Sequence, residues 1–130
     1  MTAGHWETMR QHVESQAPLE ACGLLAGRRD SVERVLPIAN HAASPRRFRM
    51  DPVEQLRALE WIESAGLDLL AIFHSHPAGP EGLSPVDIEE AAYPVVHLVW
   101  SRRAEGWTAL GFRIEAGRLN EIILRVLKER

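Results

Sequence analysis

The spacing of hydrophobic residues along the chain predicts a mixture of helices and strands. Trp6, Met9 and Val13 recur at helical spacing among polar residues within 3–16, which predicts an amphipathic helix that ends before Pro18. The continuous apolar run at 69–73 predicts a strand that is buried on both faces. Shorter apolar runs bounded by turn residues predict further strands at 22–26, 31–38, 95–100 and 107–114.

A second helix is predicted where Asp51 can act as N-cap and Pro52 occupies the first helical position. Its apolar residues follow at intervals of three, and Gly66 closes it. We expect this stripe to face the core. It consists of Val53, Leu56, Leu59 and Ile62, joined by Trp61 and Ala65.

The last segment, residues 118–127, fits two patterns. One subset of its aliphatic residues has helical spacing, and another alternates as in a strand. The residues alone leave both open.

Length and composition favour an ordinary globular protein, with residues 1–130 forming one domain. The formal charge, 15 − 18 = −3, gives no general attraction to nucleic acid or to an anionic membrane. One cysteine, Cys22, excludes an internal disulfide and fits a reducing compartment. The N-terminus lacks the apolar core of a signal peptide, so we expect a cytoplasmic protein.

Candidate chemistry lies directly after the buried strand, in the stretch HSHPAGPEGLSPVD at residues 74–87. Because side chains alternate along a strand, His74 and His76 should project to one side and Ser75 to the other. The Gly- and Pro-rich stretch at 78–82 must then form a loop.

Ser84-Pro85-Val86-Asp87 predicts the start of a short helix at about 84–92, with Ser84 at the N-cap. Residues three apart share a helix face, so Ser84 and Asp87 could both face the histidines. Two imidazoles and one carboxylate are ligands of the kind that a catalytic zinc uses, with a fourth position for water. Helix capping alone would explain Ser84 and Asp87, but it leaves the histidine pair unexplained.

The joint pattern resembles the JAMM motif of the JAB1/MPN/Mov34 (MPN) metalloproteases: HSHP at 74–77, seven residues, Ser84, two residues, Asp87. That motif also requires an upstream glutamate, which in small bacterial members sits in a segment that resembles PLEACGLLAG at 18–27. The resemblance covers essentially the whole chain. It implies an α+β fold with a mixed, curved sheet flanked by helices, as in the MPN and cytidine-deaminase-like families, and it favours a strand for residues 118–127.

The resemblance also implies an enzyme, a zinc metallopeptidase that hydrolyses an amide or isopeptide bond. Zn²⁺ would be held by His74, His76 and Asp87. Glu20 would be the catalytic base, and the Ser84 hydroxyl would help to stabilise the oxyanion.

Small bacterial relatives resemble enzymes that act on ubiquitin-like sulfur carrier proteins, releasing an amino acid such as cysteine, or a C-terminal extension, from a Gly-Gly tail. Eukaryotic relatives that cut ubiquitin chains use insertions around the active site, and the ten residues between Asn40 and Asp51 leave little room for one. We therefore expect a small carrier protein as partner, and neither nucleic acid nor a membrane. The oligomeric state, a homodimer included, stays open. The alternatives are a catalytically silent MPN scaffold and a deubiquitinase-like isopeptidase.

The remaining candidates for chemistry receive simpler interpretations. His5 and His12 should be solvated, and His97 should be a core or edge histidine and not a fourth ligand. Cys22 is interpreted as a small packing residue, with a redox-sensitive thiol as a minor alternative. The arginine-rich segment at 46–49 could form an extended edge, and its arginines could receive an acidic partner or a substrate tail; a simple solvated loop is the favoured interpretation.

Overall fold

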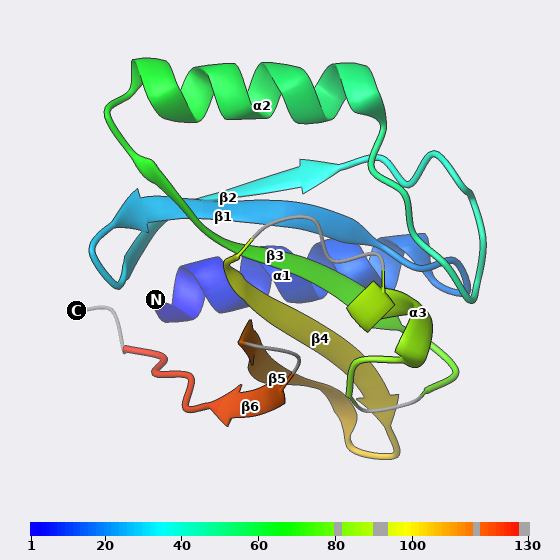
Figure 1. Cartoon of the computed structure of the whole chain (residues 1–130). Coiled ribbons are helices and arrows are strands. Elements are labelled where there is room, and N and C mark those ends of the chain that lie inside the picture. The colour runs from blue at the N-terminus through cyan, green and yellow to red at the C-terminus, as the bar shows by residue number, and fades with distance from the viewer. Residues whose placement is uncertain (80–81, 90–93, 116–117, 128–130) are drawn as a thin grey trace.

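A six-stranded sheet in the order β2-β1-β3-β4-β5-β6 runs through the molecule (Figure 1). The computed structural model describes residues 1–79, 82–89, 94–115 and 118–127. Among the described strands, β3 and β4 pair in parallel, and the other neighbours pair antiparallel. The strands are β1 (Cys22–Arg28), β2 (Ser31–Ile38), β3 (Asp68–His76), β4 (Val96–Arg103), β5 (Gly106–Glu115) and β6 (Arg118–Ile122). This is the α+β class with a mixed sheet that the sequence predicts.

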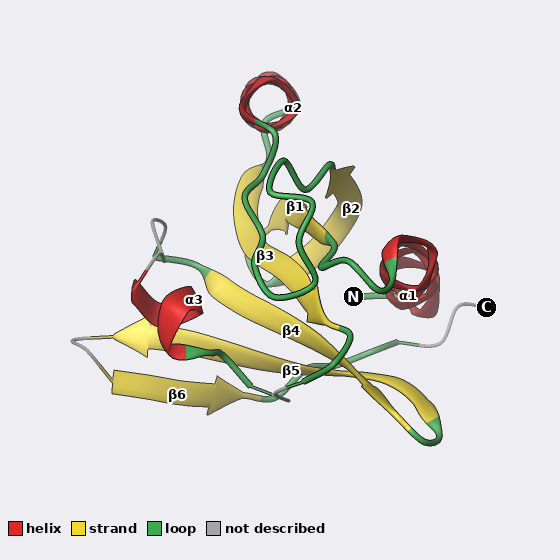
Figure 2. Ribbon diagram, turned by 90° about the vertical axis from the view of Figure 1, so that its right-hand side faces the viewer, coloured by secondary structure: helices red, strands yellow, loops and turns green. Residues whose placement is uncertain are grey.

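The two long helices lie on opposite faces of the sheet (Figure 2). Helix α1 (Ala3–Gln16) has the predicted bounds and packs Met9 and Val13 into one hydrophobic cluster. Helix α2 (Pro52–Ser64) packs Ile62 into the other. No helix among the residues described has the length and apolar character needed to span a bilayer.

Successive side chains of β3 point alternately into the two hydrophobic clusters. Phe73 packs in the α1 cluster with Leu98 and Trp100, whereas Ile72 packs in the α2 cluster with Leu24. The same alternation determines toward which face of the sheet each residue points at the end of β3, where His74, Ser75 and His76 lie.

The predicted core stripe of α2 is wrong for part of its length. Val53 and Leu56 are 56% and 57% exposed, and Trp61 is exposed as well. A helix turns about 100° per residue, so Val53 and Ile62, nine residues apart, lie about half a turn from one another. The inward face instead consists of Ala58, Leu59 and Ile62.

Two irregular segments also differ from the expectations. The tail forms a strand, β6, only to Ile122; residues 123–127 have no regular element, and Leu127 bridges to Thr2. The arginine-rich segment at 46–49 is not an extended edge, because the only pairing described there is an isolated bridge between Asn40 and Met50. The segment belongs to an exposed loop.

Candidate metal centre

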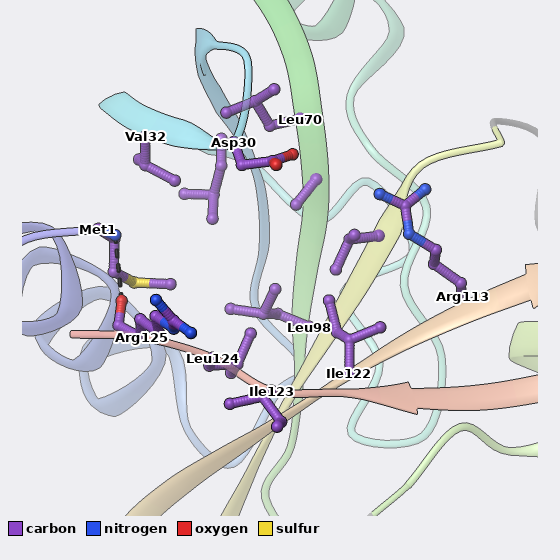
Figure 3. Close-up of a pocket in the computed structure, with 13 residues that line it drawn as sticks. Met1, Asp30, Val32, Leu70, Leu98, Arg113, Ile122, Ile123, Leu124 and Arg125 are labelled. Atoms are coloured by element: carbon purple, nitrogen blue, oxygen red, sulfur yellow. Dashed lines mark hydrogen bonds between the residues drawn. The ribbon is translucent and has the colours of Figure 1, made fainter.

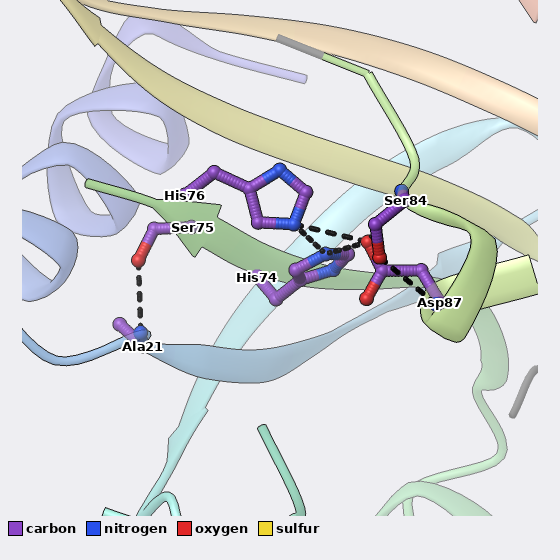
Figure 4. Close-up of polar contacts among 6 residues, drawn as sticks. All are labelled: Ala21, His74, Ser75, His76, Ser84 and Asp87. Carbon is purple, nitrogen blue, oxygen red and sulfur yellow. Dashed lines mark hydrogen bonds and ion pairs between the residues drawn. The ribbon is translucent and has the colours of Figure 1, made fainter. Parts of the chain in front are cut away.

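The end of β3 presents the two histidines. His74 and His76 follow the parity of Ile72 and project toward the α2 face, while Ser75 points the other way (Figure 4). Both imidazoles are almost completely buried, with 0% and 2% of the residue exposed. The histidines belong to the strand itself, which holds their backbones in the sheet ladder.

The loop after β3 brings the aspartate back to the histidines. Helix α3 (Pro85–Glu89) begins directly after Ser84, as predicted, whereas residues 90–92 of the expected helix lie outside the described residues. The Ser84 N–H donates to Asp87 Oδ2 at 2.9 Å, and the Asp87 N–H donates to Ser84 Oγ at 3.1 Å. This reciprocal pair caps the helix and fixes the direction of the carboxylate.

Three potential ligand atoms converge on one point. Nε2 of His74 lies 3.1 Å from Nε2 of His76, and Asp87 Oδ2 lies 3.1 and 3.0 Å from these two nitrogens. A neutral imidazole carries at most one proton on Nε2, so at most two of the three contacts can be hydrogen bonds. Ligands about 2.0–2.1 Å from a tetrahedral zinc would be about 3.3 Å apart, so the donor set fits Zn²⁺.

Glu20 reaches this point from the segment directly before β1. Cys22 pairs with His74 in the antiparallel β1–β3 ladder, so the residue two positions earlier lies across from His76. One ligand atom from each of Glu20, His74, His76 and Asp87 lies within 4.8 Å of the others. Glu20 is only 2% exposed, and within the described part of the chain its Oε1 has no hydrogen-bond partner.

Burial sets the proton affinities of these groups. The pKa of Glu20 is raised to about 7, mainly by burial; the nearby His76 opposes this rise, and Asp87 adds a smaller contribution to it. Burial also lowers the pKa of the His74 imidazole and favours its neutral, ligand-competent form. For Asp87, burial alone would raise the pKa, but hydrogen bonds from His74 and His76 hold it well below its usual range. The cluster therefore combines an ionised aspartate with a glutamate that can exchange a proton near neutrality.

Other sequence candidates lie outside this cluster. The prediction of a solvated His12 is wrong, because its Nε2 contacts the Cys22 carbonyl at 3.2 Å and its ring meets Phe73 edge-on. His5 is not simply solvated either, because its Nδ1 accepts from the Thr2 N–H in a capping box.

Two further residues behave as predicted. His97 is 5% exposed and pairs within the sheet. Cys22 is completely buried, and burial raises the pKa of its thiol to about 12, which favours packing over redox chemistry.

Two residues that the sequence analysis did not select also contact this site. Phe48 stacks on the His74 ring, and Asn40 donates a hydrogen bond to the Glu20 carbonyl. The signal for Phe48 was a lone aromatic residue among three arginines. Nothing in the sequence pattern marks Asn40.

A cavity of about 390 Å³ lies on the opposite, α1 face of the sheet (Figure 3). Apolar side chains such as Leu25, Leu98 and Ile122 line it, with Asp30 and Arg113 also present. The converging His, Asp and Glu side chains are not part of this lining, so the chemistry concentrates at the end of β3.

Comparison with known proteins agrees with this arrangement. The family model for prokaryotic homologs of the JAB domain matches residues 2–113. The chain belongs to the prokaryotic JAB family. In this family, the buried Glu-His-His-Asp cluster fits a JAMM zinc site.

Three curated relatives with named activities are similar to this JAB-family chain. A probable TtuB-protein conjugate cleaving protease of Thermus thermophilus is 47% identical over 98 residues, which span 75% of this chain and 66% of that relative. A desampylase of Haloferax volcanii is 39% identical over 112 residues, covering 80% of this chain and 81% of the relative. A CysO-cysteine peptidase of Mycobacterium bovis is 34% identical over 125 residues, with 93% and 86% covered. These named relatives are hydrolases.

Solved structures support the fold. A protein of Desulfitobacterium hafniense superposes with a TM-score of 0.88 at 37% identity, covering 98% of this chain and 92% of that one. A JAB1/MPN domain protein of Archaeoglobus fulgidus gives a TM-score of 0.58 at 18% identity, covering 95% and 94%. The second likeness concerns the fold alone.

Proposed function

We propose that this chain is a zinc-dependent peptidase or isopeptidase that hydrolyses the amide bond after the Gly-Gly tail of a small ubiquitin-like or sulfur carrier protein. The observation that carries the proposal is the convergence of His74 Nε2, His76 Nε2 and Asp87 Oδ2 within about 3.1 Å. The buried Oε1 of Glu20, which has no hydrogen-bond partner in the described parts of the chain, belongs to the carboxylate that lies beside these atoms. An inert scaffold would have no need to bury such a set of polar groups.

Each residue of the cluster has a defined role in this proposal. His74, His76 and Asp87 hold Zn²⁺, which when bound lowers the pKa of water to about 7 and polarises the scissile carbonyl. Glu20 takes a proton from the attacking water and delivers it to the departing amine nitrogen. Its pKa of about 7 suits both transfers near neutral pH.

Ser84 supplies a donor for the charge that develops on the carbonyl oxygen. Its Oγ accepts a hydrogen bond from the Asp87 N–H, and a hydroxyl that accepts one bond can still donate its proton, here to the substrate oxygen. The cap therefore orients the Ser84 side chain before substrate binds, which is the preorganisation that an oxyanion donor needs.

The names of the relatives support the proposed substrate class. One is named a probable TtuB-protein conjugate cleaving protease, the second a desampylase, and the third a CysO-cysteine peptidase. The short 40–51 connection supports a compact carrier over a ubiquitin chain held by large insertions. This chain would therefore release either a conjugated protein or a single amino acid from the carrier's C-terminus.

The test measures zinc content and cleavage together. Purified protein should contain one zinc per chain and should cleave a carrier–protein conjugate or a carrier–cysteine adduct, with activity lost in a chelator and restored by Zn²⁺. A ubiquitin dimer is the control substrate. Cleavage of the ubiquitin dimer alone would overturn the substrate class, and a zinc-free protein with no turnover would leave the scaffold alternative in place.

A further inference from the structure

The connection between β2 and α2, residues 39–51, contacts both halves of the candidate metal centre. In Figure 1 this 39–51 loop leaves β2, descends past the end of β3 and returns to the start of α2. A bridge between Asn40 and Met50 closes it at its base, and the Asp51 N–H donates to the Ala39 carbonyl at 2.9 Å. The loop is therefore a closed unit attached to the sheet.

The side-chain amide of Asn40 is the centre of the 39–51 loop. An asparagine amide offers two N–H donors and an oxygen with two lone pairs. Nδ2 donates to the carbonyls of Glu20 and Arg47 at 2.9 and 3.0 Å. Oδ1 accepts from the N–H groups of Ala42 and Arg49 at 3.0 and 2.9 Å. All four positions are used, and one of the four bonds connects the loop to Glu20.

The 39–51 loop also holds the other polar group of the Glu20 backbone. The Glu20 N–H donates to the Ser44 carbonyl at 2.8 Å. Glu20 precedes the first residue of β1, Cys22, so the loop supplies hydrogen bonds that the strand ladder does not. With both backbone groups held, the carboxylate has a defined starting direction toward the histidines.

The second ring nitrogen of His74 has no polar partner among the described residues. A metal-binding histidine normally donates its second ring N–H to a carboxylate, a carbonyl or water, which fixes the plane of the ring. The Nδ1 of His74 is buried and, among the residues described, has no hydrogen-bond partner. The Phe48 ring lies on the imidazole instead, with centroids 4.4 Å apart and an interplanar angle of 22°. Packing against Phe48 thus holds the plane of the His74 ring, for which the described residues supply no hydrogen bond at Nδ1.

We propose that the 39–51 loop aligns the base with the metal ligands, Asn40 by fixing the backbone of Glu20 and Phe48 by fixing the plane of the His74 imidazole. Both act through another residue, so they are positioning residues. The inference rests on the proposed function, which assigns the roles of Glu20 and His74. We therefore expect loss of Phe48 stacking to weaken metal binding and loss of the Asn40 donors to lower turnover.

The proposed role of Phe48 in fixing the His74 ring is tested by measuring zinc affinity. Phe48→Leu keeps an apolar side chain but removes the flat stacking face, whereas Phe48→Tyr keeps it. Zinc affinity measured by competition with a chromophoric chelator should fall about 10-fold or more in F48L and should be retained in F48Y. The visible spectrum of bound Co²⁺ should change in F48L only. His41→Ala, an exposed residue of the same loop, is the matched control. Wild-type zinc affinity and a wild-type Co²⁺ spectrum in F48L would overturn the role of Phe48.

The proposed role of Asn40 in fixing the Glu20 backbone is tested by measuring turnover and zinc binding separately. Asn40→Asp is isosteric and keeps the acceptor oxygen, but it loses both donors and turns an oxygen toward the Glu20 carbonyl. The kcat on a carrier conjugate should fall about 10–100-fold, with KM and zinc affinity unchanged. An unchanged kcat would overturn the proposal. Loss of zinc binding together with turnover would also overturn it, because Asn40 would then serve the fold as a whole. A wild-type protein that binds no zinc would instead refute the proposed function.

Discussion

The backbone of Ala21 and the side chain of Ser75 hold β1 and β3 together directly beside the candidate metal centre. The Ala21 N–H donates to Ser75 Oγ at 2.8 Å, and the Ser75 N–H donates to the Ala21 carbonyl at 3.0 Å. Ala21 follows Glu20, and Ser75 separates the two histidines, so this pair sets the distance between Glu20 and the histidines. Ser75 thus supports the segment that carries Glu20.

Ser75→Ala should therefore destabilise the protein and misplace Glu20. The substitution leaves the buried Ala21 N–H without a partner, which costs about 1–3 kcal/mol in the free energy of unfolding. Urea denaturation measures this loss, and kcat should fall with it. Ser64→Ala is the control, because the Ser64 hydroxyl bonds to the Trp61 carbonyl on the exposed side of α2. Equal stability of the two variants would contradict the role of Ser75.

Glu20→Gln should retain zinc and lose turnover. The amide keeps the shape of the side chain but cannot accept a proton, so we expect kcat to fall about 10²–10⁴-fold. Zinc content by atomic absorption should remain at one per chain, since the three ligands are untouched. His76→Ala should instead abolish stoichiometric zinc. An active E20Q enzyme would remove Glu20 from the role of base, and full zinc occupancy in H76A would remove His76 as a ligand.

The metal-free protein should lose stability as pH rises, because of Glu20. In the unfolded chain this carboxyl titrates near 4.5, and in the folded protein near 7, so the folded state binds the proton more tightly. Stability falls between these two values and stays reduced above the higher one. Glu20→Gln removes this loss, so above about pH 7 E20Q should gain up to about 3 kcal/mol over wild type.

Urea denaturation in the presence of a chelator, from pH 4 to pH 8, checks this difference. Titration of His74 and Asp87 occurs in both proteins and largely cancels in the comparison. The advantage of E20Q should shrink as the pH approaches 4.5. A difference that does not change with pH would show that burial does not perturb Glu20.

Local patterns predicted the motif side of the site well. Alternation along β3 placed His74 and His76 on one side and Ser75 on the other, and the Ser84 cap predicted the start of α3. These features depend only on period and capping chemistry, which a few consecutive residues determine.

The other half of the site depends on long-range packing. The register that pairs Cys22 with His74, and so brings Glu20 across from His76, joins residues more than fifty positions apart. No local period encodes it, so Glu20 entered the sequence analysis through a family resemblance alone. The same limit applies to the stacking of Phe48 on His74, which depends on how the 39–51 loop folds back.

The fit of Gly23 against Phe73 predicts a stability effect next to His74. A Cβ at Gly23 would lie 2.4 Å from ring atoms of Phe73 and 2.7 Å from the Leu36 carbonyl oxygen. Gly23→Ala must therefore displace backbone or the buried ring, and we expect a loss of about 1–3 kcal/mol in the free energy of unfolding. Gly82→Ala is the control, because its Cβ would meet Phe112 at an ordinary 3.4 Å. Equal denaturation midpoints for both variants would contradict this close fit.

Ser84→Ala separates the helix-capping role of the Ser84 hydroxyl, which the structure shows, from its proposed role as an oxyanion donor. Removing Oγ deletes the acceptor for the Asp87 N–H, which costs about 0.5–2 kcal/mol of stability as for other helix caps. It also deletes the proposed oxyanion donor, which should lower kcat about 10²–10³-fold with little change in KM. Ser84→Thr keeps the hydroxyl and serves as the matched variant. If S84A loses stability but keeps its kcat, Ser84 is a helix cap only, and the oxyanion must be stabilised by the metal and other donors.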